Sequence, residues 1–153
     1  MRLLLDTNYF LPAVGVTIKG FPEDTPIKLI ENGHQLFMSE ITIFELSAKG
    51  AKYVAVGTLT AERVARGIRA IIYDERITAV PIYDSSVLNI AFTLRKILSD
   101  FIDCIILSSA INQSDTLITE DEDMQNLRKS REYQELLQKT NPKFEIKTLA
   151  DVL

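Results

Sequence analysis

The sequence predicts an α/β protein: a three-layer α/β/α sandwich around a central, mainly parallel sheet of about five strands. Short apolar runs of strand length alternate with longer helical segments along the whole chain. Connections of helical length join parallel strands through right-handed crossovers. The chain has 153 residues, of which 46% are hydrophobic, so we expect a single domain over residues 1–153 with one substantial core.

The first strand is the apolar run LLL at 3–5, which ends at Asp6. The following stretch, YFLPAVGV, suggests a short helix that is disturbed by Pro12 and closed by Gly15. A second helix follows a loop, with Thr25 as its cap and Gly33 beyond its end.

QLFMS at 35–39 is the second expected strand, and a helix runs from Glu40 to about Lys49. The apolar face expected for this helix carries three residues, Ile41, Phe44 and Ala48. Residues 51–57 are ambiguous and could extend it. Thr60 caps the next helix, which runs to about Tyr73.

ITAVPIY at 77–83 is rich in β-formers, but Pro81 keeps much of it out of the centre of a sheet. A helix then starts at Asp84 or Ser85 and runs to about Leu98. The last elements are a buried helix at 100–112, a strand at 116–119, a charged helix at about 122–139 and a strand at 144–149.

Composition excludes several kinds of chemistry. Cys104 is the one cysteine and His34 the one histidine, so an internal disulfide and a cysteine zinc site are excluded. Any chemistry is expected to use carboxylates, hydroxyls and a metal. No run of 18 apolar residues exists, and the N-terminus does not resemble a signal peptide, so we expect a cytoplasmic protein without a membrane segment.

Acidic residues follow the expected strands. Asp6 comes directly after the first strand, and the stretch LITEDEDM places Glu120 and Asp121 directly after the fourth. The ends of parallel strands meet at one rim, where α/β proteins bind their ligands. Glu45 and Asp103 lie on helices, the first after a strand and the second at the start of an apolar helix. Each acid taken alone could equally cap a helix or face solvent.

A shared cation would relieve the repulsion among these carboxylates. Oxygen ligands of this kind suit Mg²⁺ or Mn²⁺. Such an ion activates water and stabilises charge on phosphate oxygens, so a phosphodiester substrate is expected.

Four stretches in order resemble the PIN-domain family over nearly the whole chain: LLLDTN, FEL around Glu45, DCIILSSA from Asp103, and LITEDED. The resemblance implies a Mg²⁺- or Mn²⁺-dependent ribonuclease with catalytic acids at Asp6, Glu45, Asp103 and Asp121. It implies metal ligands at Asp6, Asp103, Asp121 and Asp123, with Asn8 and Thr119 in support. Many small relatives are VapC-type toxins, so an antitoxin partner and a homodimer are also implied.

The net charge of −4 becomes +1 when the five candidate acids are left out, so the rest of the chain can approach a nucleic acid. The densest basic stretch carries Lys49, Lys52, Arg63, Arg66 and Arg69. These residues could contact phosphates, or they could form a solvated helical face. Single-stranded RNA as the substrate is implied by the family resemblance.

Three other classes of protein also place acids at such a rim. A PIN-fold module that binds RNA or protein without cutting keeps the same acids, and it remains the alternative. A phospho-receiver domain requires adjacent acids after the first strand, and a haloacid-dehalogenase-type phosphatase requires DxDxT; the sequence DTNYF provides neither.

Overall fold

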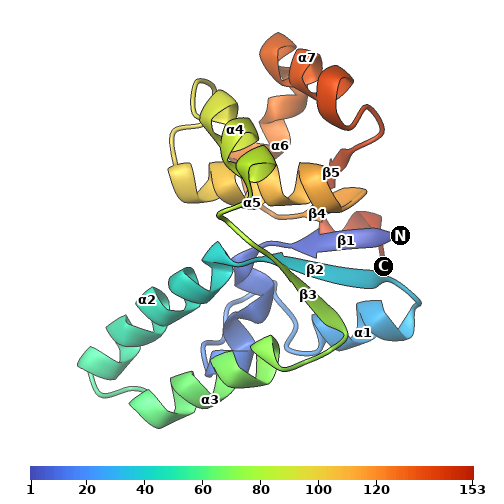
Figure 1. Cartoon of the computed structure of the whole chain (residues 1–153). Coiled ribbons are helices and arrows are strands. Elements are labelled where there is room, and N and C mark those ends of the chain that lie inside the picture. Colours follow the sequence, from blue (N-terminus) through green and yellow to red (C-terminus); the bar gives the residue numbers. More distant parts are fainter.

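The computed structural model describes residues 1–153 and contains one five-stranded, all-parallel sheet in the order β3-β2-β1-β4-β5 (Figure 1). The strands are β1 Arg2–Leu5, β2 Gln35–Ser39, β3 Ile77–Val80, β4 Thr116–Ile118 and β5 Glu145–Lys147. The α-helices are α1 Thr25–Glu31, α2 Ile41–Ala55, α3 Ala61–Ile72, α4 Ser85–Leu94, α5 Phe101–Gln113, α6 Glu122–Asn126 and α7 Arg131–Thr140. The 3-10 segments are η1 Thr7–Val14, η2 Leu127–Lys129 and η3 Leu149–Asp151.

Helices cover both faces of the sheet, as the sequence predicts. Figure 1 shows α1, α2, α3 and η1 on one side of the sheet and α4, α5, α6 and α7 on the other. Side chains of a strand alternate between its faces. Accordingly, Leu3 and Leu5 join the core with η1 and α3, whereas Leu4 joins the core with α4, α5 and α7. The sheet is therefore buried on both sides.

The register aligns the carboxyl ends of the central strands. Leu4 lies opposite Phe37 of β2 and Leu117 of β4, and the Asp6 N–H donates to the Ile118 carbonyl at 3.1 Å. The residues that follow these strands consequently share one rim of the sheet. This alignment places the acids that the sequence singled out on the same side of the molecule.

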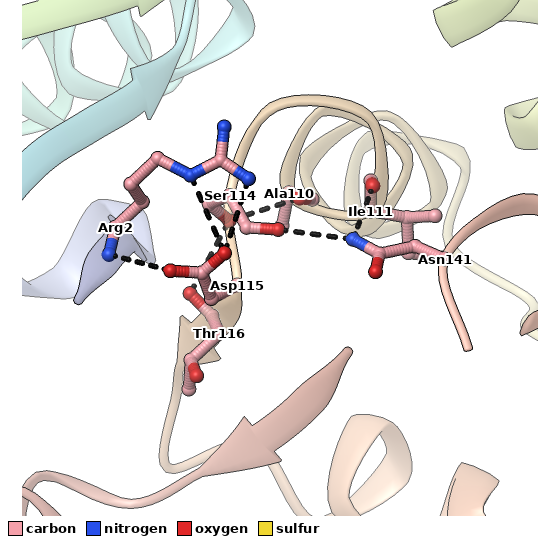
Figure 2. Close-up of polar contacts among 7 residues, drawn as sticks. All are labelled: Arg2, Ala110, Ile111, Ser114, Asp115, Thr116 and Asn141. Carbon is pink, nitrogen blue, oxygen red and sulfur yellow. Dashed lines mark hydrogen bonds and ion pairs between the residues drawn. The ribbon is translucent and has the colours of Figure 1, made fainter. Parts of the chain in front are cut away.

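Polar contacts tie the elements together at the opposite rim, as Figure 2 shows. The Arg2 N–H donates to Asp115 Oδ2 at 2.9 Å, and the Arg2 guanidinium donates to Asp115 Oδ1 at 3.0 Å. Asn141 donates to the carbonyls of Ile111 and Ser114 at 3.0 and 3.1 Å. These carbonyls end α5 and would otherwise lack partners. The polar side chains at this opposite rim thus hold β1, α5 and the chain after α7 together.

The expected charged helix at 122–139 is wrong as a single element. The chain instead forms α6, the short η2 and then α7. Ser130 interrupts the run because its hydroxyl accepts a hydrogen bond from the Tyr133 N–H at 3.3 Å and caps α7. The same run buries Met124, Leu127, Tyr133 and Leu137, which one straight helix would not place on one core.

The apolar face predicted for α2 is also wrong in part. Thr42, Leu46 and Gly50 are the buried residues of this helix, and Phe44 is 61% exposed. The helix extends to Ala55 and packs on η1 and α3, which selects the face that carries the small Gly50. Thr25 likewise does not cap α1, because its hydroxyl donates to the Pro22 carbonyl. None of the helices is long and apolar enough to cross a membrane.

Candidate active site

Asp6 directly follows β1 and caps η1. Its Oδ1 accepts a hydrogen bond from the Thr7 N–H at 2.7 Å, and its Oδ2 accepts from the Thr119 hydroxyl at 2.6 Å. The Thr119 hydroxyl also accepts from the Asp121 N–H at 3.1 Å. One buried threonine after β4 therefore holds the acid after β1 and the backbone of the acid after β4.

Asp121 caps α6, because its Oδ1 accepts a hydrogen bond from the Met124 N–H at 2.8 Å. The capping role and the cleft-lining position coexist, since Asp121 also lines the acidic cleft. Asp121 is therefore both a helix cap and a candidate site residue. Capping uses one carboxylate oxygen and fixes the direction of the other.

Glu45 lies on α2 and is tied to η1. The Thr7 hydroxyl donates to Glu45 Oε1 at 2.5 Å and lies 3.1 Å from the Thr42 hydroxyl. Farther along the same helix, Lys49 Nζ donates to Asn8 Oδ1 at 3.0 Å. Two side chains of η1 thus set the positions of an acid and a base on α2.

The N-terminus of α5 adds two more acids. Asp100 caps this helix by accepting a hydrogen bond from the Ile102 N–H at 2.9 Å, and Asp103 lies in its first turn. Helix α5 is the central helix of its layer and packs on β1, β2 and α2. That packing brings its acidic end to the same rim as Asp6.

An open cleft of roughly 420 Å³ at this rim collects these side chains. Its lining consists of Asp6, Thr7, Asn8, Phe21, Glu45, Lys49, Asp100, Asp103, Glu120 and Asp121. The four predicted catalytic acids therefore lie in one cleft, together with Asn8 and Lys49. Thr119 lies directly beneath it and contacts Asp6 and Asp121 from the buried side.

The acids of the cleft perturb one another. Burial, followed by the charges of Asp100, Asp6, Asp121 and Glu45, raises the pKa of Asp103 from 3.8 to about 7. Each neighbour disfavours the ionised form of this carboxyl by like-charge repulsion. A perturbed carboxyl group in a cleft is a feature of functional sites.

Asp6 and Glu45 also have raised pKa values, and burial is the main cause in both. The raised pKa of Asp6 is opposed by hydrogen bonds from Thr119 and Thr7, and that of Glu45 by the bond from Thr7. The charge of Lys49 lowers both pKa values. The hydrogen bonds thus favour the ionised carboxylates that a cation would require.

Glu120 reaches the cleft but is held by structural partners. Its Oε1 accepts hydrogen bonds from the Tyr9 hydroxyl at 2.8 Å and from the Leu149 N–H at 2.9 Å. These contacts join η1, the end of β4 and η3. The carboxylate of Glu120 therefore serves the packing of three segments.

Several predicted residues lie outside the cleft. Asp123 is exposed and lines a neighbouring hollow with Leu98, Ser99 and Asn126. Among the basic residues only Lys49 lines the cleft; Lys52 and Arg66 are exposed. Arg63 donates to the Ala13 carbonyl at 2.6 Å, and Arg69 pairs with Glu62 at 3.2 Å. The structure therefore does not gather these bases around the acids.

Asp100 is the acid that the sequence interpretation missed. It is the first residue of the helix expected at 100–112, whereas in the structure it caps α5 and its charge acts on both Asp103 and Glu45. The spacing of two acids three residues apart, DFID, was a usable indication, since such residues share a helix face.

The donor set of the cleft suits a hard divalent cation, because the acids present only oxygen. After burial, the neighbouring carboxylates are the causes that raise the pKa of Asp103, and a cation would relieve their repulsion. No three acids, histidines or cysteines are gathered at one point in the way that a preformed metal centre requires. The chemistry of the residues fits, and ion binding would draw the carboxylates together.

A parallel α/β sheet with carboxylates from separate segments gathered at its carboxyl rim defines an acidic-cleft α/β protein. The PIN domain family model matches residues 3–130, so the chain belongs to the PIN domain family. PIN domains are generally nucleases. The fold resemblance inferred from the sequence motifs is thereby confirmed.

Among solved structures, the chain resembles one of VapBC2 from Rickettsia felis bound to a DNA fragment from their promoter. The TM-score is 0.59 at 18% sequence identity, over 97% of this chain and 98% of that one. At this identity the likeness concerns the fold. None of the curated proteins compared matches the chain.

Proposed function

We propose that this protein is a Mg²⁺- or Mn²⁺-dependent endoribonuclease that hydrolyses phosphodiester bonds of single-stranded RNA. The observation that carries the proposal is that Asp6, Glu45, Asp103 and Asp121, from four separate segments, line one cleft. Membership of the PIN domain family supports the same class of activity.

Asp6, Asp103 and Asp121 would hold the ion, with Asp123 as an accessory acid from the adjoining hollow. When bound, Mg²⁺ or Mn²⁺ supplies activation of water and neutralisation of charge on the phosphate. Thr119 and Thr7 keep Asp6 oriented and favour its ionised form.

Glu45 lies on the α2 side of the cleft. Thr7 occupies its Oε1, which leaves Oε2 to accept a proton. Burial keeps the pKa of Glu45 above its ordinary value, which strengthens it as a base. Lys49, held by Asn8, would meet phosphate oxygens at the same wall, whereas Lys52, Arg63, Arg66 and Arg69 would contact more distant parts of an RNA strand.

The test is cleavage of labelled single-stranded RNA by the purified chain with Mn²⁺, with Mg²⁺ and with chelator. Asp103→Asn, prepared identically, removes a candidate ligand from the cleft. Glu122→Gln is the matched control, because it removes an exposed charge in the same acidic stretch outside the cleft. We expect metal-dependent cleavage by the natural chain and by Glu122→Gln, with loss in Asp103→Asn.

Equal cleavage by Asp103→Asn would contradict the assignment of the site. The alternative is a non-catalytic PIN-fold module that binds RNA or protein, and the lack of three pre-gathered ligands favours it. Metal and RNA binding without cleavage, across several RNAs, would support that alternative.

We infer further that the chain acts in the cytoplasm as the toxin of a toxin–antitoxin pair, with a protein antitoxin and a second copy of itself as partners. The likeness to a VapBC2 complex supports this inference. Induced expression should stop growth only when the cleft is intact, and light scattering of the purified chain should give the mass of a dimer. Normal growth together with active RNA cleavage in vitro would separate the toxin role from the nuclease role.

A further inference from the structure

The last turn of α4 and the first turn of α5 expose two aromatic rings that lie against one another. Phe92 is 58% exposed and Phe101 is 37% exposed, although both side chains are large and apolar. The ring centroids are 5.9 Å apart and the ring planes differ by 5°, so the rings are stacked in parallel. An exposed parallel pair of this kind presents a flat apolar surface to which a third ring can add.

An unpaired cation accompanies the two rings. Arg95 follows Phe92 by three residues and keeps helical backbone angles, φ −60° and ψ −20°, so both side chains leave the same face of α4. The Arg95 side chain is exposed and forms no ion pair within the chain. Its charge is therefore available to an external anion. We call Phe92, Arg95 and Phe101 the aromatic–basic patch.

The aromatic–basic patch adjoins the acidic cleft. Phe101 directly follows Asp100, which lines the cleft, and Asp103 lies in the same first turn of α5. Adjacent Cα atoms are only about 3.8 Å apart. Helix α4 packs along α5, which keeps Phe92 and Arg95 at this end of the helix pair (Figure 1). A nucleic-acid strand with one phosphate in the cleft can therefore reach the patch with a nearby nucleotide.

This combination of rings and charge is specific to the α4–α5 end. The other close aromatic pair, Tyr9 with Phe21, meets edge to face, and Tyr9 is buried. Among the arginines of α3, Arg63 donates to the Ala13 carbonyl and Arg69 pairs with Glu62. Those two guanidinium groups already have partners within the chain, whereas that of Arg95 has no ionic partner.

We propose that the aromatic–basic patch is a binding subsite for single-stranded RNA beside the cleft. One base stacks on Phe92 and Phe101, and the guanidinium of Arg95 contacts a phosphate of the same strand. This inference rests on the proposed function, because it takes RNA as the substrate. It adds a place outside the acids where the strand is held.

The chemistry of the patch fits this occupant. Proteins hold single strands by stacking bases on aromatic side chains and by placing cations along the backbone. Every base has a flat face, so such a subsite accepts any sequence. A stable protein interface requires about 800 Å² per partner, far more than two rings supply. The exposed residues around the rings, Thr93, Lys96 and Ser99, are polar, which also favours a nucleic acid.

The test of stacking is the binding of a short, fluorescently labelled single-stranded RNA, measured by anisotropy in chelator so that the RNA stays intact. Phe92→Leu keeps an apolar side chain and removes the ring, whereas Phe92→Tyr keeps the ring. Tyr73→Leu is the matched control, because Tyr73 is an exposed aromatic residue at the end of α3, on the other side of the sheet. Thermal unfolding by circular dichroism establishes that each variant is folded.

We expect Phe92→Leu to bind the RNA roughly tenfold more weakly, with Phe92→Tyr and Tyr73→Leu close to the natural chain. A single abasic nucleotide, moved along the RNA, should weaken binding by a similar factor at one position. The same abasic RNA should bind Phe92→Leu as well as intact RNA does. Unchanged binding by a folded Phe92→Leu would overturn the proposal.

The phosphate contact is tested by the dependence of RNA affinity on salt. Arg95→Gln should make the slope of log affinity against log salt concentration shallower by about 0.7, the value for one contact to a single strand. Lys96→Gln is the matched control, because Lys96 is the next residue but lines a separate hollow with Glu132 and Glu135. An unchanged slope in Arg95→Gln would contradict the role of Arg95.

Three further outcomes separate this proposal from its alternatives. A Phe92→Leu chain that binds RNA normally but has half the natural mass by light scattering would assign the patch to a contact between copies and overturn the proposal. RNA binding that depends on Phe92, without cleavage in Mn²⁺, would support the patch and contradict the proposed nuclease function. Cleavage in Mn²⁺ at equal efficiency by the natural chain and Phe92→Leu would overturn the patch and leave the nuclease function standing.

Discussion

The Thr119 hydroxyl donates a hydrogen bond to Asp6 Oδ2 at 2.6 Å, so the end of β4 holds the acid at the end of β1. The Thr119 hydroxyl oxygen also accepts a hydrogen bond from the Asp121 N–H at 3.1 Å. Two adjacent parallel strands thus meet through one side chain beneath the cleft. The bond opposes the effect of burial on the pKa of Asp6 and favours its ionised form.

Thr119→Val keeps the shape of this fully buried side chain and removes its hydroxyl. We expect Mn²⁺ affinity and RNA cleavage to fall by about 10- to 100-fold, as for other residues that orient a metal ligand. The free energy of unfolding should fall by about 1–3 kcal/mol, because Asp6 and the Asp121 N–H each lose a partner. Thr119→Ser should restore most of the affinity; failure of the serine variant to do so would locate the effect in packing.

The stability of the metal-free chain should fall as the pH rises from about 4 to 7. The folded state keeps a proton on Asp103, whose pKa is about 7, and the unfolded state loses it near the ordinary value of 3.8. Where the folded state binds more protons than the unfolded state, the free energy of unfolding decreases with pH. Asp103→Asn removes this contribution and should be more stable than the natural chain above pH 7.

Urea unfolding in chelator, followed by circular dichroism at several pH values, measures this difference. The free energy of unfolding of the natural chain minus that of Asp103→Asn, plotted against pH, gives the contribution of the Asp103 carboxyl group. We expect the difference to grow to roughly 1–2 kcal/mol across the window, after discounting for solvent screening at a partly exposed group. Parallel curves from pH 4 to 8 would contradict the raised pKa.

Tyr9→Phe should lower the free energy of unfolding by about 1–2 kcal/mol, because the Glu120 carboxylate loses one of its two hydrogen-bond donors. RNA cleavage should be nearly unchanged if Glu120 has a structural role. Tyr133→Phe is the matched control: its buried hydroxyl has no partner, so its removal should be neutral or stabilising. A large loss of cleavage in folded Tyr9→Phe would assign Glu120 to the chemistry.

Gly67→Ala should destabilise the chain by about 1–3 kcal/mol through overpacking. A Cβ at this position of α3 would collide with the Ala13 carbonyl and lie 2.8 Å from Val14 Cα. The higher helix propensity of alanine returns only about 1 kcal/mol. Thermal unfolding measures the net effect, and an unchanged or higher Tm would show that α3 can move away from η1.

The order of strands and helices and the rim positions of Asp6 and Asp121 followed from local patterns. Apolar runs of strand length, with acids directly after them, suffice when the strands are parallel, because their carboxyl ends then meet at one edge. Glu45 and Asp103 were harder to place, since each lies on a helix whose rotation depends on its packing. Their positions on the expected helices made both acids candidates, and the family resemblance then assigned them to the catalytic set.

Local patterns failed where packing chooses between similar faces or interrupts a helix. Phe44 was expected in the core and is exposed, because Gly50 allows α2 to approach Val64 of α3 on another face. The charged run after Asp121 breaks at Ser130, because one straight helix could not bury both Met124 and Tyr133. Neither outcome is visible in a short window of sequence.

The fold class and the acidic, oxygen-only character of the candidate site could be read from the chain alone, since both depend on residue type and order. Only the tertiary structure decided which charges act on one another. It brought Asp100 to the cleft, left Asp123 and four of the five predicted bases outside it, and held Lys49 beside Asp6 and Glu45. The physical reason is that electrostatic coupling depends on distance and burial, and both are set by how α2 and α5 pack around η1 and the sheet.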